Sequence, residues 1–377
     1  MNKVKVTFET ITPLWTGDAW QKNVKIRPSS IIGSLRFWFE IFCYFSDIEV
    51  KSYEEELNYE QFIKSVRKHI KNGKNPEEAE DQALCDLGIS LPSRIFGCKG
   101  WRGRVKIKEV TPVNGYCFGN KLNLPKVISL NKQYGTWKDF IKKNKDNWSS
   151  WFLSNPYFYG KFQVTFEADD VIRDSVLFPL LKFIENYGFL GGKWNTGYGR
   201  VKINKLDLNK NYNEFKLSNF YKKNNERFED KDITSIVVSD NEKSFNDSKN
   251  CEVLSFFLNI DNFNCGNEKD FDEKTSTIPK EIRITKFDDL NSENFKEILK
   301  KLLKKKAKIR NCLRPYDNVD DKNKWNNFRH KLLGTTKKFT EGTKVLPLIY
   351  KENGKWKGTL MSIAGIMNFK EESNGEQ

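Results

Sequence analysis

Histidine is scarce in this sequence, and the usual metal-binding motifs are absent. Only His69 and His330 occur among 377 residues, and neither lies at metal-ligand spacing from a cysteine. The seven cysteines form no Cys-x-x-Cys pair, and an odd number at irregular spacing favours reduced thiols over a disulfide framework. We therefore predict no metal site, no disulfide-stapled fold and no cofactor.

Long apolar runs are also missing. The most apolar stretch, residues 35–45, is interrupted by Arg36 and Glu40 and is far shorter than the roughly 20 residues that cross a bilayer. Residues 1–8 alternate polar and apolar side chains, which is typical of a strand and not of a signal peptide. We expect a cytoplasmic protein with no membrane partner.

Positive charge is in excess. Lys and Arg number 65 against 50 Asp and Glu, which gives a formal net charge of +15. Such a charge favours a polyanionic partner, with nucleic acid as the leading candidate. The alternative is a basic surface that is merely solvated. The length of 377 residues allows two domains, each with its own core.

Hydrophobic periodicity predicts a mixed fold for residues 1–208. Val4, Val6 and Phe8 alternate as in a strand, and Pro28 opens a segment with the apolar stripe of a helix. The charged stretch at residues 54–80 is predicted to be a helical insertion. Two strands, a helix and a last strand are then expected at residues 105–110, 159–166, 176–184 and 201–203. The order βαββαβ predicts an α+β domain of ferredoxin-like (RRM-like) type.

The rest of the chain divides into a polar segment and a second patterned region. Residues 209–250 are rich in Asn, Lys, Asp and Ser, which is typical of a linker or flexible excursion. Residues 251–377 begin with a strand pattern, continue with an amphipathic helix from Phe295, and close with a hairpin at 345–363. We predict a second ferredoxin-like domain there.

A glycine-rich stretch precedes the last strand of the first domain. Glycine lets the backbone approach a ligand and turn its amides towards a phosphate, while basic and aromatic side chains add charge and stacking faces. The alternative is a tight helix-to-strand turn that needs glycine only for its geometry. The predicted RNA contacts in this stretch are Gly191, Gly192, Lys193, Trp194, Asn195, Gly197, Tyr198, Gly199 and Arg200.

Further candidate RNA contacts are basic or lie at a helix start. The free amides of a helix N-terminus favour anions, and Arg can bind phosphate through two hydrogen bonds. The alternatives are ordinary helix caps, strand-edge residues and solvated surface. The candidates are Arg27, Ser29, Ser30 and Arg36 around the first helix, Arg102 and Arg104 before a strand, and Arg329, Lys337 and Lys338 on either side of Gly334.

Three stretches of the chain resemble the RAMP superfamily of CRISPR systems, and within it a subunit family of type III-B (Cmr) effector complexes. They are residues 12–17, residues 26–39 and residues 188–200. The resemblance implies two ferredoxin-like RAMP domains and a non-catalytic place in an antiviral complex. It also implies contacts with the guide RNA 3′ region, with captured target RNA and with other subunits of that complex.

Two alternatives stay open. One is a RAMP-type endoribonuclease that processes the guide or cleaves the target, because Asp18 follows the first strand roughly where cleaving RAMP subunits carry an Asp. His69 and His330 could serve as acid or base, but neither has a clear partner in the sequence. The other alternative is a protein scaffold whose basic surface never meets RNA.

Overall fold

The computed structural model describes most of the first 205 residues and parts of the chain after residue 289. The described residues are 2–17, 22–45, 48, 50–51, 55–113, 125–130, 148–152, 156–205, 290–292, 294–312, 333, 345–352 and 354–362. The predicted linker at 209–250 and the candidates Asp18, Arg329, His330, Lys337 and Lys338 lie outside them.

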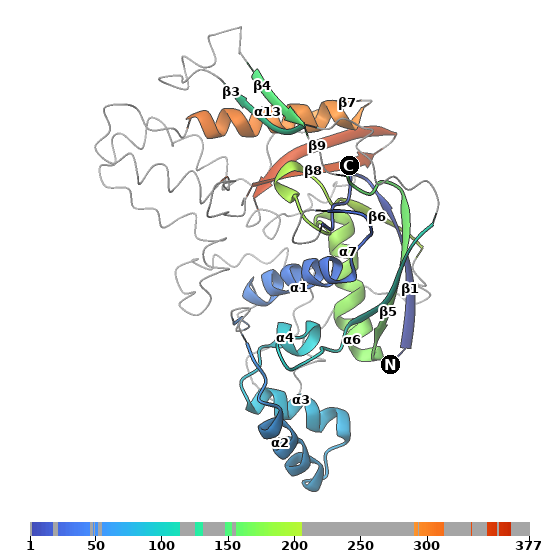
Figure 1. Ribbon diagram of the computed structural model, residues 1–377, viewed down its shortest axis with the longest axis vertical. Coiled ribbons are helices and arrows are strands. Elements are labelled where there is room, and N and C mark those ends of the chain that lie inside the picture. Colours follow the sequence, from blue (N-terminus) through green and yellow to red (C-terminus); the bar gives the residue numbers. More distant parts are fainter. Residues whose placement is uncertain are drawn as a thin grey trace, which may run out of the picture.

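Four strands form an antiparallel sheet in the order β2-β5-β1-β6 (Figure 1). The helices α1 and α7 fall between β1 and β2 and between β5 and β6, so the predicted order βαββαβ is confirmed. This strand order and connectivity are those of a ferredoxin-like domain. The bounds are β1 Asn2–Thr10, α1 Pro28–Phe45, β2 Lys106–Pro112, β5 Lys161–Ala168, α7 Phe178–Asn186 and β6 Val201–Lys205.

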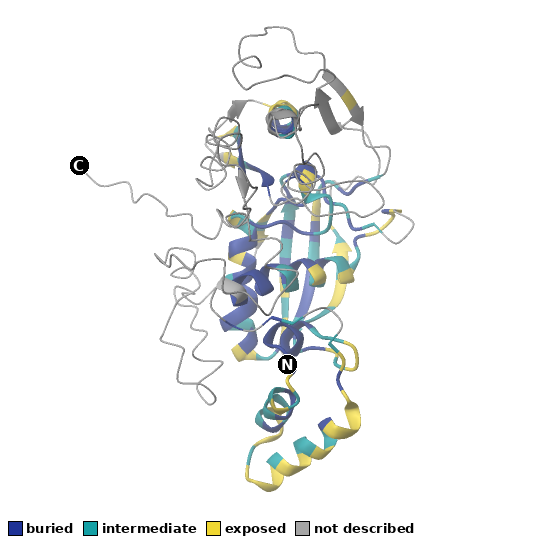
Figure 2. Cartoon of the chain, turned by 90° about the vertical axis from the view of Figure 1, so that its left-hand side faces the viewer, coloured by how far each residue is buried: buried dark blue, intermediate teal, exposed yellow. Residues whose placement is uncertain are grey.

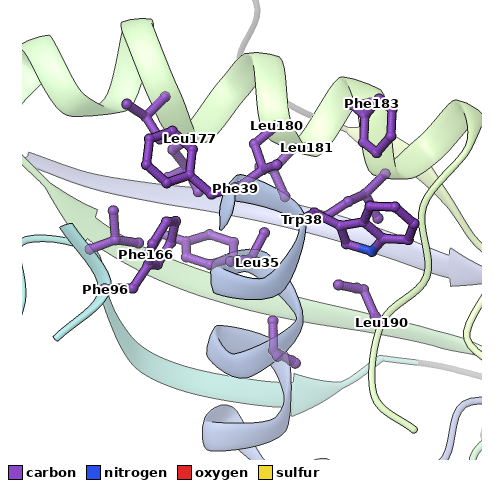
Figure 3. Packing of buried hydrophobic residues seen from close by; sticks show 14 of the residues in the cluster. Leu35, Trp38, Phe39, Phe96, Phe166, Leu177, Leu180, Leu181, Phe183 and Leu190 are labelled. Atoms are coloured by element: carbon purple, nitrogen blue, oxygen red, sulfur yellow. The ribbon is translucent and has the colours of Figure 1, made fainter. Parts of the chain in front are cut away.

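The sheet buries one face against the two helices. Val6 pairs with Val164 and Phe8 with Phe162, and all four side chains are fully buried. Trp38 of α1 enters the same core (Figure 3), and its indole nitrogen donates a hydrogen bond to the carbonyl oxygen of Phe189 at 3.1 Å. The opposite face of the sheet is polar, and its exposed residues include Lys3, Lys5 and Lys202.

Two helices fill the charged insertion, as predicted. They are α2 (Tyr59–Lys71) and α3 (Pro76–Asp86), which form a projection that we call the arm (Figures 1 and 2). Asn58 caps α2 by accepting a hydrogen bond from the amide of Gln61, and Asn75 caps α3 in the same way. The short α4 (Leu91–Phe96) follows and returns the chain to the domain.

Several elements were not expected from the sequence. Between β2 and β5 the strands β3 (Pro125–Leu130) and β4 (Trp148–Phe152) pair as a separate two-stranded sheet. The approach to α7 consists of α6 (Asp170–Ile172) and a π-helical turn, η1 (Arg173–Leu177). The glycine-rich loop contains a 3₁₀ turn, η2 (Trp194–Thr196).

The later region contains a three-stranded antiparallel sheet in the order β7-β9-β8 and the helix α13. The bounds are β7 Leu290–Ser292, α13 Phe295–Cys312, β8 Val345–Glu352 and β9 Lys355–Ser362. The predicted helix from Phe295 and the closing hairpin are therefore confirmed. The strand expected after residue 251 falls outside the described residues, and a second ferredoxin-like domain stays a prediction.

Candidate nucleic-acid interface

The glycine-rich loop joins α7 to β6 through four residues of positive φ. Gly191, Gly197 and Gly199 have φ of 74°, 78° and 94°, and Lys193 has φ of 62°. A Cβ at Gly199 would lie 2.1 Å from the carbonyl oxygen of Leu190. Glycine is therefore required at 199 by backbone geometry, and a valine there would disrupt the fold before it tested any ligand.

Most amides of the loop are already hydrogen-bonded inside the chain. The Gly191 amide donates to Ser34 Oγ at 2.9 Å, and the Gly192 amide donates to the Trp15 carbonyl at 2.7 Å. The Gly199 amide donates to the Pro13 carbonyl at 2.9 Å. The prediction that these amides surround a phosphate is therefore corrected. Their N–H groups instead hold the loop against α1 and the segment after β1.

Arg200 has a structural role in place of the predicted contact with RNA. Its guanidinium is 1% exposed and donates hydrogen bonds to the carbonyl oxygens of Ile184 (2.9 Å), Glu185 (2.8 Å), Asn186 (2.8 Å) and Gly188. It thereby caps the C-terminus of α7. Burial lowers the pKa of Arg200 to about 9, so the side chain remains charged at neutral pH. No face of this guanidinium is left for a phosphate.

Tyr198 and Trp194 are also less available than the sequence suggests. Tyr198 is 1% exposed and packs edge-on against Tyr157, with ring centroids 6.4 Å apart. Trp194 is half-buried and stacks on Trp38 at 5.6 Å. The prediction that bases stack on these two rings is corrected. The Tyr198 ring is buried, and one face of the Trp194 ring already packs on Trp38 in the core.

The first half of the loop meets the start of α1 at one surface. Lys193 Nζ lies 4.5 Å from the centroid of the Trp15 ring. The amide of Arg27 donates to Thr16 Oγ1 at 3.1 Å, so both basic residues border the same segment. We call this the loop–helix surface, which comprises Trp15, Lys25, Arg27, Ser29, Ser30, Gly191, Gly192, Lys193, Trp194 and Asn195; Lys25, Ser29 and Asn195 are exposed and the rest half-buried.

Two indole donors at this surface lack an acceptor. Trp15 Nε1 and Trp194 Nε1 are buried and have no hydrogen-bond partner within the described part of the chain. An unmet buried donor costs about 1–3 kcal/mol, so an oxygen brought by a ligand would be stabilising there. Trp15 was not among the predicted contacts. Its place in the motif after the first strand, two residues before Gly17, was the available clue.

The opposite side of the loop is covered by the later region of the chain. Lys306 of α13 donates from Nζ to the carbonyl oxygens of Asn195 and Val345, both at 3.1 Å. Arg200 Nε donates to the carbonyl oxygen of Ile349 on β8 at 3.2 Å. The loop therefore has one face towards the loop–helix surface and one face packed on α13 and β8.

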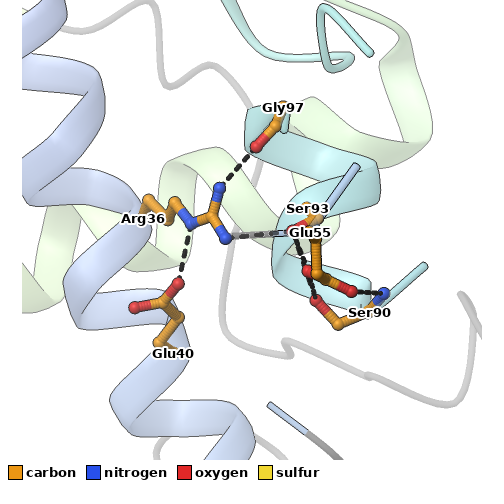
Figure 4. A network of polar contacts seen from close by, with 6 residues as sticks. All are labelled: Arg36, Glu40, Glu55, Ser90, Ser93 and Gly97. Atoms are coloured by element: carbon orange, nitrogen blue, oxygen red, sulfur yellow. Dashed lines mark hydrogen bonds and ion pairs between the residues drawn. The ribbon is translucent and has the colours of Figure 1, made fainter. Parts of the chain in front are cut away.

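Arg36 lies apart from the loop–helix surface, in a polar network between α1 and α4 (Figure 4). Its side chain is 11% exposed, pairs with Glu40 at 2.7 Å and donates to Ser93 Oγ at 2.9 Å and to the Gly97 carbonyl. The prediction of an RNA contact at Arg36 is corrected, since its donors hold two helices together.

Two further basic candidates within the described residues, Arg102 and Arg104, lie beyond the turn that follows α4. Arg104 is half-buried, donates to the Glu77 carbonyl at 3.2 Å and lies 3.7 Å from Asp81 on α3. It therefore has a structural partner where a contact with RNA was predicted. Arg102 is exposed in the turn after α4. His69 Nε2 lies 2.7 Å from Asp86 in the arm.

No group of three His, Cys, Asp or Glu side chains that could hold a metal ion occurs among the described residues. Among the same residues, no helix combines the length and apolar character needed to span a membrane.

The fold is thus an antiparallel ferredoxin-like sheet whose last strand follows a glycine-rich loop. The family model of the RAMP superfamily matches residues 7–202, just over half of the sequence, and the chain belongs to this superfamily. No curated protein matches the sequence.

Similar solved structures include two proteins from Pyrococcus furiosus. One is Cmr1 in its apo form, with 13% identity, coverage of 96% of this chain and 88% of that chain, and a TM-score of 0.36. The other is Cmr6, with 18% identity, coverage of 54% and 98%, and a TM-score of 0.23.

Proposed function

We propose that this protein is a non-catalytic, RNA-binding subunit of a type III-B CRISPR effector complex, acting in the cytoplasm. Membership of the RAMP superfamily and the type III-B resemblance of residues 12–17, 26–39 and 188–200 support the assignment. Its partners would be the guide RNA 3′ region or captured target RNA, together with the other subunits.

The observation that carries the proposal is the composition of the loop–helix surface. Lys193 and Arg27 border one short segment, and two indole N–H groups beside them lack acceptors. Lys and Arg supply the phosphate contacts that position RNA, and an acceptor on the RNA would satisfy the indoles. The formal net charge of +15 adds long-range attraction for a polyanion.

The experiment compares the full chain with the double variant Arg27→Gln/Lys193→Gln. Binding of a labelled single-stranded RNA is measured over a range of salt concentrations. Loss of two phosphate contacts should reduce the slope of log K against log [salt] by about 1.4. Lys5→Gln/Lys202→Gln, on the open face of the sheet, is the matched control for the change in net charge. An unchanged slope in the first variant would refute the site.

The absence of catalysis is tested separately. The protein, alone and assembled with its partner subunits, is incubated with labelled RNA and Mg²⁺. We expect the RNA to remain intact. Cleavage that disappears in Asp18→Ala would overturn the non-catalytic assignment and favour the endoribonuclease alternative.

A further inference from the structure

The outer face of α2 carries a row of cations. Lys64, Arg67, Lys68 and Lys71 are all exposed, and they recur at the three- and four-residue spacing that places side chains on one face of a helix. We call these four residues the basic stripe. At 1.5 Å of rise per residue the stripe covers about 10 Å of the helix.

No side chain of the basic stripe makes a hydrogen bond or salt bridge within the described part of the chain, although Lys68 interacts electrostatically with Asp86 and Glu60 lies four residues before Lys64. Other surface cations do have such partners. Lys99 pairs with Glu56 at 2.8 Å, and Lys182 pairs with Glu185 at 3.2 Å. The stripe is therefore a local concentration of positive charge that faces solvent.

Two carboxylates of the neighbouring helix α3, those of Asp81 and Asp86, have partners within the arm and in α4. Asp81 lies 3.2 Å from Arg94, and Asp86 lies 2.7 Å from His69 and 3.0 Å from Gln82. Burial raises the pKa of Asp86, but the hydrogen bonds from Gln82 and His69 outweigh this and lower it. These two acids join α2 and α3 to each other and to α4.

The arm that bears the stripe is anchored to the domain. Phe62 on the inner face of α2 is 4% exposed and contacts the ring of Trp101, with centroids 5.7 Å apart. The Trp101 indole donates to the carbonyl oxygen of Arg94 in α4 at 2.9 Å. The small core of Leu57, Phe62, Ala83, Leu84 and Ile89 holds α2 and α3 together. The stripe is thus presented on a fixed helix.

We propose that the basic stripe is a second RNA-binding site, which takes the phosphate backbone of single-stranded RNA independently of its sequence. Lys and Arg are the residues that contact phosphates, whereas Lys is depleted in protein–protein interfaces, so RNA fits the stripe better than an acidic protein surface does. Tyr59, 63% exposed at the start of α2, offers a face on which a base can stack. The proposal relies on the proposed function for RNA as the ligand and is independent of the loop–helix surface.

The test uses the full-length triple variant Lys64→Gln/Arg67→Gln/Lys71→Gln. Lys68 is retained because its charge contributes to the lowered pKa of Asp86. Gln has a helix propensity close to those of Lys and Arg, so α2 should persist, which circular dichroism verifies. Binding of a labelled, unstructured RNA is followed by fluorescence anisotropy. The salt concentration is varied from about 0.05 to about 0.5 M, a range over which RNA affinity that depends on phosphate contacts falls steeply.

Loss of three phosphate contacts should reduce the salt slope by about 2 and the affinity by about 100-fold at 0.1 M salt. The matched control is Lys3→Gln/Lys5→Gln/Lys202→Gln, which removes the same charge from the open face of the sheet and should retain the affinity. An unchanged slope in the stripe variant would overturn the proposal. Equal losses in both variants would also overturn it, because net charge alone would then explain the effect.

Two further outcomes distinguish RNA binding by the basic stripe from a protein contact and from RNA binding by the loop–helix surface. If the stripe variant binds RNA normally but no longer assembles with its partner subunits, the stripe is a protein contact and the proposal is wrong. If the stripe variant loses affinity while Arg27→Gln/Lys193→Gln does not, the stripe is supported and the loop–helix surface is refuted. If Arg27→Gln/Lys193→Gln loses affinity while the stripe variant does not, the proposed function is supported and the proposal for the basic stripe is wrong.

Discussion

The side-chain amine of Lys306 lies 3.1 Å from the carbonyl oxygen of Asn195 and thereby joins α13 to the glycine-rich loop. The same amine donates to the carbonyl oxygen of Val345 at 3.1 Å, and the residue is 8% exposed. Two carbonyl oxygens accept the hydrogen bonds of this amine in place of water. The contact between the loop and the later region is therefore built on a buried amine.

The pH dependence of stability should reveal the titration of Lys306. Burial, followed by the nearby Arg310, lowers the pKa of Lys306 well below its ordinary value. Above that lowered pKa and below about 10.4, the unfolded chain binds more protons at this site, so the free energy of unfolding should rise with pH. Thermal melts between about pH 6 and pH 10 should show this rise for the native chain relative to Lys306→Met. Parallel melting curves for the two proteins would contradict it.

Arg200 should be among the residues whose loss costs most. Arg200→Met leaves five carbonyl oxygens without their donor, and we expect a loss of at least about 3 kcal/mol in the free energy of unfolding. Arg200→Lys should also destabilise, because an ammonium group cannot reproduce the planar fork of five donors. Urea denaturation measures both changes. Lys202→Gln, exposed two residues away, is the control and should stay within about 0.5 kcal/mol.

Thr12 should stabilise the end of the glycine-rich loop that contains Arg200. Its Oγ1 donates to the carbonyl oxygen of Gly197 at 2.7 Å and accepts from the amide of Arg200 at 3.0 Å. Thr12→Val retains the shape but removes both bonds, and should cost about 1–3 kcal/mol by denaturant unfolding. Thr12→Ser keeps the hydroxyl and should restore much of the loss. Equal destabilisation by both substitutions would show that packing, and not the hydroxyl, matters here.

Two glycine-to-alanine substitutions should have opposite effects. At Gly199 the positive φ and the carbonyl oxygen 2.1 Å from the new Cβ forbid a side chain, so Gly199→Ala should yield little folded protein. Gly33 lies within α1, and nothing would lie within 4 Å of a Cβ there. Gly33→Ala should stabilise by about 0.5–1 kcal/mol, because alanine is the better helix former. A lower melting temperature for Gly33→Ala would contradict this.

The sequence predicts the order of elements in the first domain because apolar residues recur with clear periods. Val6 and Phe8 alternate with polar neighbours in β1, and the stripe that contains Trp38 in α1 has helical spacing. The strands β3 and β4 were missed. Both strands are short, and apolar residues are adjacent in each (Val127 and Ile128 in β3, Trp151 and Phe152 in β4), so neither shows the alternation of a half-buried strand.

The packing of the glycine-rich loop could not be predicted from the sequence. A Cβ at Gly191 or Gly199 would collide with the carbonyl oxygen of Trp15 or Leu190, so close backbone packing accounts for glycine at both positions. The role of Arg200 depends on carbonyl oxygens of residues 184–188 and 349, and nothing in the local sequence shows that these converge on one guanidinium. Lys64 and its neighbours were not among the predicted contacts, because the partners of the nearby acids become visible only in the fold.

The insertion that forms the arm starts and finishes at nearly the same place. Glu55 accepts a hydrogen bond from the amide of Ser90 at 2.8 Å, and Leu57 and Ile89 share one small core. The arm therefore leaves the domain and returns to it at adjacent points, and Asp81 and Phe62 fasten it to Arg94 and Trp101. A longer or shorter pair of helices at this position would change the reach of the arm and leave the register of the four-stranded sheet as it is.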